Sequence, residues 1–312
     1  MNVRIGVDLG GTKIEAVVVD TTASDQPRER ARHRLPTNRD LGYDHILEQA
    51  RLTIIEVAKQ ASIDPMTTPI GVGMPGARTF RHADGRKSEL PLVKNANTTH
   101  LNGRPFFRDL SQAVGREIAF ANDANCFALA EATWGAARGA RVAFGVILGT
   151  GVGGGIVLPG ATGLRAWDGA QSIAGEWGHV SLDPLNGPQC YCGRRGCIET
   201  LLSGPAVEKA YADRKGSPLS LLEIGKATTT DDVAHTLLAE RMDLFGRAIA
   251  TVINILDPDV VVLGGGVSNL PQLYTDGIAA TARWVFNDGL DTKIVKHALG
   301  DSAGVLGAAL LE

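Results

Sequence analysis

The sequence has few aromatic residues and almost no net charge. Phenylalanine, tryptophan and tyrosine make up 5% of the 312 residues, and 34 acidic and 31 basic residues leave a net charge of −3. No stripe of lysine and arginine marks a surface for nucleic acid, and no low-complexity tail is present. The length is sufficient for two domains with a large core. We therefore expect an ordinary α/β protein without a nucleic-acid partner.

The sequence also lacks long apolar segments. No run approaches the roughly 20 apolar residues of a membrane span, and no basic stretch followed by an apolar one opens the chain. Cysteine is scarce too, and three of the four cysteines fall within eight residues. This grouping argues against a disulfide framework and for a reducing compartment. We expect no signal peptide, no membrane partner and a cytoplasmic location.

Strand-like runs and glycine-rich turns occur in both halves of the chain. Residues 3–7 and 14–19 flank a Gly-Gly turn and predict a hairpin, and residues 142–148 and 155–158 flank a second such turn. Helical periodicity follows each pair, most clearly over residues 231–256. The pattern predicts two α/β domains with a cleft between them. We place them at residues 1–120 and 121–298, with a final helix, about residues 299–312, packing back on the first.

Three glycine-rich loops are candidates for binding a nucleotide. Gly10-Gly11-Thr12-Lys13 offers N–H groups, a hydroxyl and a cation to an anion, although a plain hairpin turn explains the same residues. Residues 149–155 match G-x-G-x-x-G, but a strand-like segment follows where a dinucleotide-binding dehydrogenase needs a helix. In residues 263–267 three glycines let a base or ribose approach the backbone. The P-loop motif is absent.

Two aspartates stand at the ends of predicted strands. Asp8 precedes the first glycine turn, and an acid beside a phosphate requires a cation, so we predict that it faces Mg²⁺. A turn-capping role is the alternative. Asp123 lies where a strand meets a helix. It is either the helix N-cap or a base that accepts a proton from a sugar hydroxyl group.

A compact set of metal-binding residue types follows in the second half. His179, Cys190, Cys192 and Cys197 supply one imidazole and three thiolates, the donor set of a closed, structural zinc site. Buried small side chains or a redox pair are the alternatives. The charged neighbours of these cysteines suit a surface loop better than a core, which favours zinc.

Taken together and in this order, DLGGTK, NDAN, LGTGVGGG, GEWGH, CYCGRRGCIE and LDPDVVVLGGG resemble the ROK family of bacterial sugar kinases and repressors. The resemblance extends over nearly the whole chain. It implies a two-domain ribonuclease H-like (actin-like ATPase) fold, ATP with Mg²⁺, a structural zinc and a homodimer. It assigns the catalytic base to Asp123 and zinc to the four residues named above.

The same resemblance implies two further groups of site residues. The sugar contacts of the family fall on Gly76, Ala77, Asn97, Asn122, Asp123, Glu176, His179 and Glu199. The ATP contacts fall on Asp8, Gly10, Gly11, Thr12, Lys13, Thr150, Gly151, Gly264, Gly265 and Gly266.

Within the family, VKNANTTHLNG and GEWGH look most like the bacterial fructokinase (mannokinase) branch. This implies phosphorylation of D-fructose at its 6-hydroxyl group, with glucokinase, mannokinase and N-acetylglucosamine kinase as alternatives. The segment between Ile156 and Gly175, which carries Arg165, Trp167 and Asp168, is a few residues longer than the family spacing and borders the sugar site, so substrate preference stays open.

A sugar-sensing repressor is the less favoured reading, because only seven residues precede Asp8 and leave no room for a DNA-binding helix-turn-helix.

Overall fold

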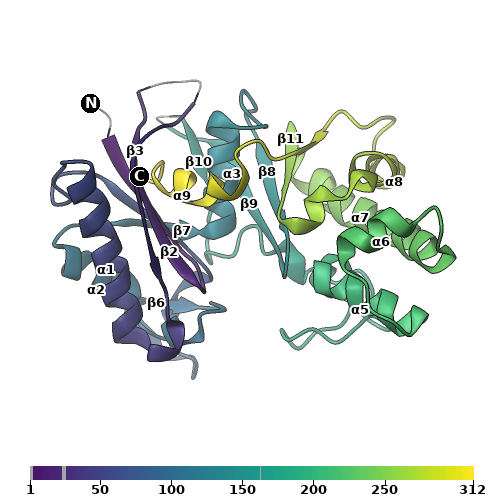
Figure 1. Cartoon of the computed structure of the whole chain (residues 1–312), viewed down its shortest axis with the longest axis horizontal. Coiled ribbons are helices and arrows are strands. Elements are labelled where there is room, and N and C mark those ends of the chain that lie inside the picture. The colour runs from purple at the N-terminus through teal and green to yellow at the C-terminus, as the bar shows by residue number, and fades with distance from the viewer. Residues whose placement is uncertain (1–2, 23–25, 162) are drawn as a thin grey trace. The chain divides into compact units, whose positions relative to one another are not determined.

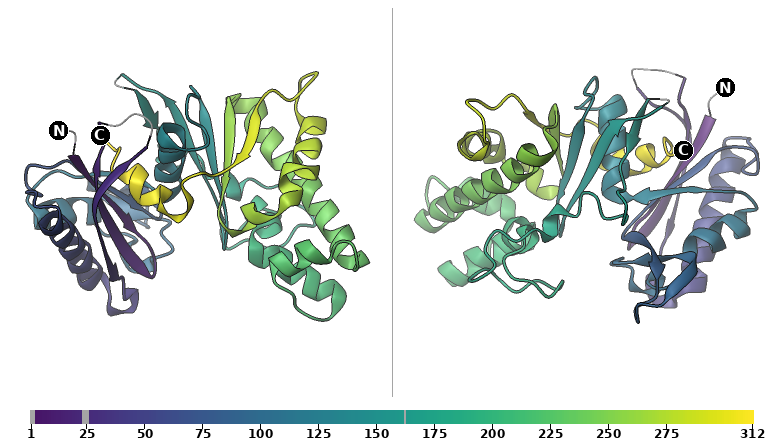
Figure 2. Two further views of the ribbon diagram at one scale, coloured as in Figure 1. Left: turned by 45° about the horizontal axis from the view of Figure 1, so that its top comes forward. Right: turned by 180° about the vertical axis from the view of Figure 1, so that it is seen from behind.

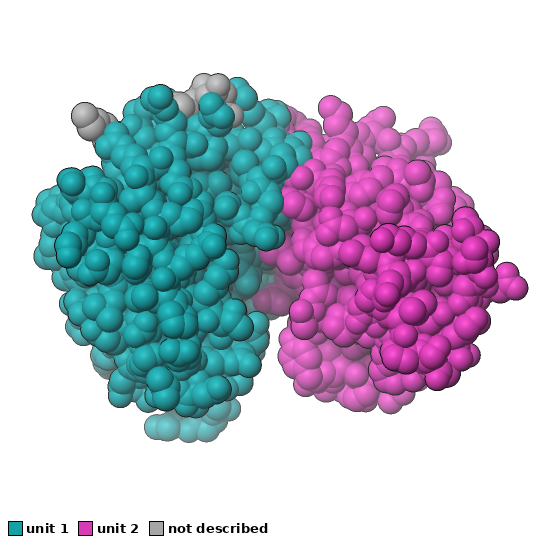
Figure 3. Space-filling model, viewed as in Figure 1, with its two compact units in different colours: residues 1–139, 155–174, 298–312 teal, residues 140–154, 175–297 magenta. Residues whose placement is uncertain are grey.

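The computed structural model describes residues 3–22, 26–161 and 163–312, which form two compact units (Figure 3). The first unit comprises Met1–Gly139, Gly155–Ala174 and Ala298–Glu312, and the second comprises Ala140–Gly154 and Gly175–His297. The predicted domain boundary at residue 120 stays a prediction.

The first unit is built on a five-stranded sheet with the order β3-β2-β1-β4-β7. Strands β1 and β2 pair antiparallel with Leu9 opposite Ile14, which confirms the predicted hairpin. Strands β1, β4 and β7 run parallel. The elements of this unit are β1 (Val3–Leu9), β2 (Lys13–Asp20), β3 (Arg28–Pro36), α1 (Tyr43–Gln60), β4 (Ile70–Met74), β5 (Ala77–Arg81), β6 (Lys87–Lys94), α2 (Phe106–Val114), β7 (Ala119–Asn122), α3 (Asp123–Trp134), β10 (Leu164–Ala166) and α9 (Ala303–Ala308).

The two faces of this sheet are covered by different helices (Figure 1 and Figure 2). Because side chains alternate along a strand, Ile5, Val7 and Leu9 all point to one face, where they join a buried cluster with α1 and α2. Gly6 and Gly71 lie on the opposite face, against α9. A Cβ atom on Gly71 would lie 1.9 Å from the carbonyl oxygen of Ala308. Glycine at these positions lets the backbone of α9 rest directly on the sheet.

A second five-stranded sheet has the order β10-β9-β8-β11-β12, and the division into units falls within β9. Strands β8, β11 and β12 run parallel. The predicted second glycine turn joins β8 to its neighbour β9, so a strand rather than a helix follows it. The bounds are β8 (Ala143–Leu148), β9 (Val152–Pro159), β11 (Val260–Gly264) and β12 (Lys293–Lys296).

The helices of the second unit are led by α7 (Asp232–Leu256), as the periodicity predicts. The side chain of Asp231 caps it by accepting hydrogen bonds from the N–H groups of Val233 and Ala234. Among the described residues, no helix combines the length and apolar character that crossing a membrane requires. The other helices are α4 (Ile198–Leu202), α5 (Gly204–Lys215), α6 (Leu221–Ala227) and α8 (Asp276–Trp284).

Candidate active site and metal centre

The two aspartates predicted at strand ends, Asp8 and Asp123, lie at the same edge of the first sheet. Asp8 in β1 is opposite Gly73 in β4, and Met74 in β4 is opposite Asn122 in β7. Since these three strands are parallel, their carboxyl ends meet at one edge, where ligands bind in open α/β sheets. The register therefore brings Asp8 to Asn122 and Asp123, which are more than a hundred residues away in the sequence.

Asn122, rather than Asp123, is the N-cap of α3. Its Oδ1 accepts a hydrogen bond from the N–H of Ala124 at 2.9 Å, and its Nδ2 donates to the carbonyl oxygen of Gly76 at 3.0 Å. Asp123 is the first residue of the helix, and its Oδ1 also accepts from Ala124 N, at 2.8 Å. A helix N-terminus favours a negative charge at this position. The cap role that the sequence left open for Asp123 thus belongs mainly to its neighbour.

The environment of Asp8 disfavours its charged form. Burial, followed by the negative charges of Asp123 and Glu15, raises the pKa of Asp8 to about 7, although Lys13 acts in the opposite direction. Carboxylate oxygens are the donors that Mg²⁺ prefers. A divalent cation beside Asp8 would remove the repulsion from Asp123, so these residues fit the predicted ion.

Three of the predicted sugar contacts line one pocket of the first unit. Gly76 has φ +87°, and a Cβ atom there would lie 2.5 Å from the carbonyl oxygen of Lys94, so no larger residue fits without a shift. We call it the sugar pocket after these predicted contacts. Its lining residues are Met74, Gly76, Ala77, Arg78, Phe107, Phe120, Ala121, Asn122, Asp168 and Ser172.

Asp168 also lines the sugar pocket. From the sequence it was named only as part of the long segment between Ile156 and Gly175 and was not predicted as a sugar contact. Its Oδ1 accepts a hydrogen bond from Nδ2 of Asn125 at 2.8 Å, and Oδ1 of Asn125 accepts from Ile156 N at 3.2 Å. Partial burial raises the pKa of Asp168, while the bond from Asn125 and the charge of Arg78 lower it. No spacing in the sequence links residues 125 and 168, so only the structure assigns this carboxylate to the pocket.

Asn97 is not among the residues that line the sugar pocket. Its side chain is exposed, and its Oδ1 accepts a long hydrogen bond of 3.5 Å from the hydroxyl of Thr98. The loop is held instead by Asn102, which the sequence did not single out and whose side chain forms two hydrogen bonds of 2.9 Å with the backbone of Ala96. Sugar binding by Asn97 stays a prediction.

The first glycine turn closes on itself and on β2. Gly10 N donates to the carbonyl oxygen of Lys13 at 2.9 Å, and Lys13 Nζ forms an ion pair with Glu15 at 2.9 Å. Glu15 is buried and also binds Arg32 and Arg34; although burial raises its pKa, these hydrogen bonds bring it to about 2. The predicted phosphate contact Lys13 is therefore already paired with a carboxylate.

The second glycine turn is tied to a predicted sugar contact. Oε2 of Glu199 accepts a hydrogen bond from Val152 N at 2.9 Å, and a Cβ atom on Gly151 would lie 2.6 Å from the same oxygen. Thr150 occupies the tip of this turn between β8 and β9. Any movement of Glu199 is thus coupled to the turn predicted to bind phosphate.

The third glycine loop follows β11. Gly265 has φ +80°, and a Cβ atom there would lie 2.3 Å from the carbonyl oxygen of Leu148. Gly266 has no described atom within 4 Å of an added Cβ. Gly264 is the last residue of β11, so the loop begins at the carboxyl end of this strand, and the backbone at Gly266 is the part that has room for the predicted nucleoside.

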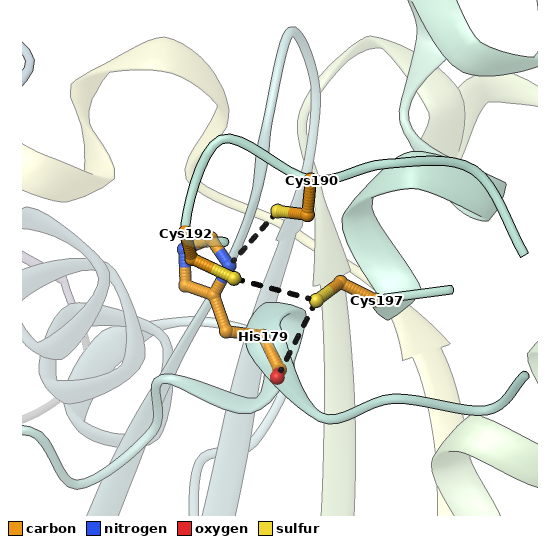
Figure 4. A group of neighbouring side chains, drawn as sticks. All are labelled: His179, Cys190, Cys192 and Cys197. Atoms are coloured by element: carbon orange, nitrogen blue, oxygen red, sulfur yellow. Dashed lines mark hydrogen bonds between the residues drawn. The ribbon is translucent and has the colours of Figure 1, made fainter. Parts of the chain in front are cut away.

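The predicted zinc ligands lie together in the second unit (Figure 4). The four ligand atoms of His179, Cys190, Cys192 and Cys197 all lie within 4.8 Å of one another. Cys190 Sγ is 3.6 Å from His179 Nδ1, and Cys192 Sγ is 3.6 Å from Cys197 Sγ. A tetrahedral zinc site with bonds of about 2.0–2.3 Å places its ligand atoms about 3.5–3.8 Å apart. The geometry and the donor set therefore fit zinc.

Two neighbours of this cluster organise it further. The other ring nitrogen of His179, Nε2, lies 2.9 Å from the hydroxyl of Tyr191, the kind of contact that orients a ligating histidine. Glu176 precedes the short 3₁₀ helix η3 (Trp177–His179), and its carbonyl oxygen accepts from His179 N at 3.3 Å. A metal at the cluster would thus also position the backbone of Glu176.

Comparisons with known proteins agree with these features. The model of the ROK family matches residues 4–312. An N-acetyl-D-glucosamine kinase from Photobacterium profundum is 35% identical over 319 residues, 98% of each chain. The crystal structure of a ROK hexokinase from Thermus thermophilus has a TM-score of 0.82 and 32% identity, covering 99% of this chain and 97% of that one.

A ROK family glucokinase from Streptomyces griseus, solved with glucose and AMPPNP, has a TM-score of 0.74 and 27% identity over 99% of each chain. These likenesses confirm the predicted fold class, the actin-like ATPase fold of ROK sugar kinases.

Proposed function

Since this chain is a sugar kinase of the ROK family, we propose that it transfers the γ-phosphoryl group of ATP to the 6-hydroxyl group of a hexose. The observation that carries the proposal is the meeting of Asp8, Asn122 and Asp123 at one sheet edge, together with the sugar pocket that Asn122 lines. The AMPPNP bound to the glucokinase from S. griseus supports ATP as the phosphoryl donor.

Asp123 acts as the base in this proposal. Phosphoryl transfer requires a group that accepts the proton of the attacking hydroxyl. It also requires alignment of the two substrates and neutralisation of the phosphate charge. Asn122 and Gly76 are fixed to each other by a hydrogen bond and would hold the sugar beside Asp123. When bound, Mg²⁺ would neutralise phosphate charge, with Asp8 as the residue that holds it, directly or through water.

The glycine loops bind the nucleotide in this proposal. Gly10, Gly11, Thr12, Thr150 and Gly151 would donate to the phosphates, and the loop of Gly264–Gly266 would receive the adenosine. The remaining sugar contacts, Glu176, His179 and Glu199, come from the second unit.

We propose N-acetyl-D-glucosamine as the first sugar to test. The N-acetyl-D-glucosamine kinase from P. profundum, which is 35% identical over 98% of this chain, supports this choice. The fructose assignment rested on short motifs such as VKNANTTHLNG and stays a prediction. Discrimination between such sugars depends on a few hydrogen bonds in one pocket, and Asp168 supplies an acceptor there that the motifs do not encode.

Initial rates of ADP formation with Mg-ATP test the proposal. The sugars are N-acetyl-D-glucosamine, D-glucose, D-mannose and D-fructose at equal concentration, with a sugar-free control. The highest kcat/KM for N-acetyl-D-glucosamine supports the proposed substrate, and the highest value for fructose supports the motif-based prediction instead. If no sugar raises the rate above the control, the proposed reaction is wrong.

A further inference from the structure

A second pocket of the first unit adjoins the sugar pocket and is strongly basic. It has a volume of about 350 Å³, and it shares Arg78 and Ser172 with the sugar pocket. Its described lining residues include four cations and no acid. They are Arg78, Thr79, Phe80, Arg81, Lys87, Ser88, Lys94, Ala170, Gln171 and Ser172. We call this the basic pocket.

All four cations of the basic pocket belong to the β5–β6 hairpin. Arg81 is directly opposite Lys87 in the antiparallel register, next to a bulge after Thr79. Like charges in directly opposed positions destabilise a strand pair. The acids of the hairpin are Asp84, which is paired with Arg86, and Glu89, and neither lines the pocket. The chain as a whole is slightly acidic, so this gathering of positive charge is local.

The remaining lining groups suit a polar ligand with one apolar side. The hydroxyl of Thr79 accepts a hydrogen bond from Arg81 N at 3.2 Å, which leaves its proton for another acceptor. Phe80 is 53% exposed and offers an aromatic edge. Ser172, at the junction of the two pockets, has φ +53°, a backbone conformation that costs energy in a residue other than glycine and that gathers at ligand sites.

We propose that the basic pocket binds the phosphate group of a phosphorylated sugar. Four cations without a lining acid match a phosphate monoester, which carries about two negative charges at neutral pH, better than a singly charged carboxylate. The volume exceeds that of a phosphate alone and leaves room for a sugar ring against Phe80. Only the origin of the ligand rests on the proposed function, because a hexose phosphate is the product of that reaction; binding itself does not depend on turnover.

Isothermal titration calorimetry of the full chain tests this inference without any catalytic step. The probes are D-glucose 6-phosphate, inorganic phosphate and D-glucose. In excess D-glucose, which competes for the sugar pocket, we expect the sugar phosphate still to bind one site per chain. The variants Arg81→Gln and Lys87→Gln each remove one charge-assisted hydrogen bond and should weaken binding about tenfold. Neither residue belongs to the proposed catalytic machinery, so basal sugar phosphorylation should not change.

Lys59→Gln is the matched control, since Lys59 is an exposed lysine at the end of α1 that lines neither pocket. Its affinity for the sugar phosphate should equal that of the wild type. The melting temperature of Arg81→Gln without ligand should not fall, because the change relieves a like-charge pair. The proposal is overturned if D-glucose 6-phosphate does not bind, or if it binds Arg81→Gln, Lys87→Gln and Lys59→Gln with equal affinity. It is also overturned if D-glucose competes fully with the sugar phosphate, or if inorganic phosphate binds as tightly as the sugar phosphate.

Discussion

At the scale of single residues, the candidate site depends on two carboxylates with different surroundings. Asp123 begins a helix, where the N-terminal N–H groups favour its charge, whereas Asp8 is penalised by burial and by the charge of Asp123. Both are aspartates at strand ends in the sequence. Their distinct electrostatics follow from the neighbours that the sheet supplies.

The first prediction concerns Asp123. Replacing Asp123 with Asn removes the proton acceptor but keeps the size of the side chain, so kcat should fall by about 10²–10⁴-fold, the usual contribution of a general base. Steady-state kinetics measures the effect. Asp213→Asn, which removes an exposed carboxylate paired with Lys209, is the control and should keep wild-type turnover. Near-normal turnover of Asp123→Asn would remove the base assignment.

The second prediction concerns Asp8 and pH. Its pKa is about 7 in the folded protein against an ordinary value of 3.8, so the folded state holds the proton more tightly than the unfolded state between these values. Stability is therefore lost as the pH rises from about 4 to about 7. In Asp8→Asn this loss should disappear. Without Mg²⁺ the variant should be more stable than the wild type at pH 8, by an amount on the order of a few kcal/mol, and similar at pH 4.

Urea unfolding at a series of pH values measures this difference, again with Asp213→Asn as the control. If the free energy of unfolding depends on pH in the same way in the wild type and in Asp8→Asn, the carboxyl group of Asp8 does not have a raised pKa in the folded protein.

At the scale of elements, local patterns predict hairpins and long helices well. The turn of Gly10–Lys13 and helix α7 both follow from periodicity and turn residues. The β5–β6 hairpin was not predicted, because polar and charged residues fill it and a bulge interrupts its alternation. Strand β3 was missed for a similar reason, since arginines alternate along it. Alternation of polar residues with other polar residues leaves no hydrophobic signal.

The third prediction concerns the contact between α9 and the first sheet. In Gly71→Ala the new methyl group would meet the carbonyl oxygen of Ala308 at 1.9 Å, which requires the helix to move. Overpacking of this kind costs about 1–3 kcal/mol or more in free energy of unfolding. Chemical denaturation measures the loss. Gly289→Ala, where a Cβ has no atom within 4 Å, should be nearly neutral. A neutral Gly71→Ala would argue against the close packing of α9.

The fourth prediction concerns the metal cluster. Cys192→Ser should lose bound zinc, and because metal binding and local folding are coupled, the backbone of Glu176 and His179 should shift with it. We expect KM for the sugar to rise about tenfold or more. Metal analysis and kinetics on the same preparations measure both effects, with the exposed Arg195→Gln as the control. Full sugar affinity in a zinc-free variant would separate the cluster from the sugar site.

At the scale of the whole molecule, we expect a homodimer. The family resemblance supports this, and the exposed apolar side chains of Ile255, Trp284 and Phe286 in the second unit are compatible with burial against another surface. Sedimentation equilibrium should give about twice the chain mass of 32.8 kDa. A single-chain mass across a range of protein concentrations would contradict the expectation.

The amino-acid sequence alone determined the features that depend on neighbours in the chain. The one histidine and three cysteines of the predicted zinc site lie within a stretch of 19 residues, so spacing and residue type were sufficient to single out this cluster. The first two glycine turns are enclosed by the strands they join, and turn residues between apolar runs were sufficient to predict them. The order of these motifs was also enough to indicate the family and, with it, the class of fold.

Only the tertiary structure decided which distant residues meet. The parallel register of β1, β4 and β7 brings Asp8 to Asp123, and the side chain of Asn125 holds Asp168 at the sugar pocket. Likewise, the opposition of Arg81 and Lys87 follows from a bulge that no motif marks. These juxtapositions depend on packing and strand register across the whole unit, which local periodicity does not encode.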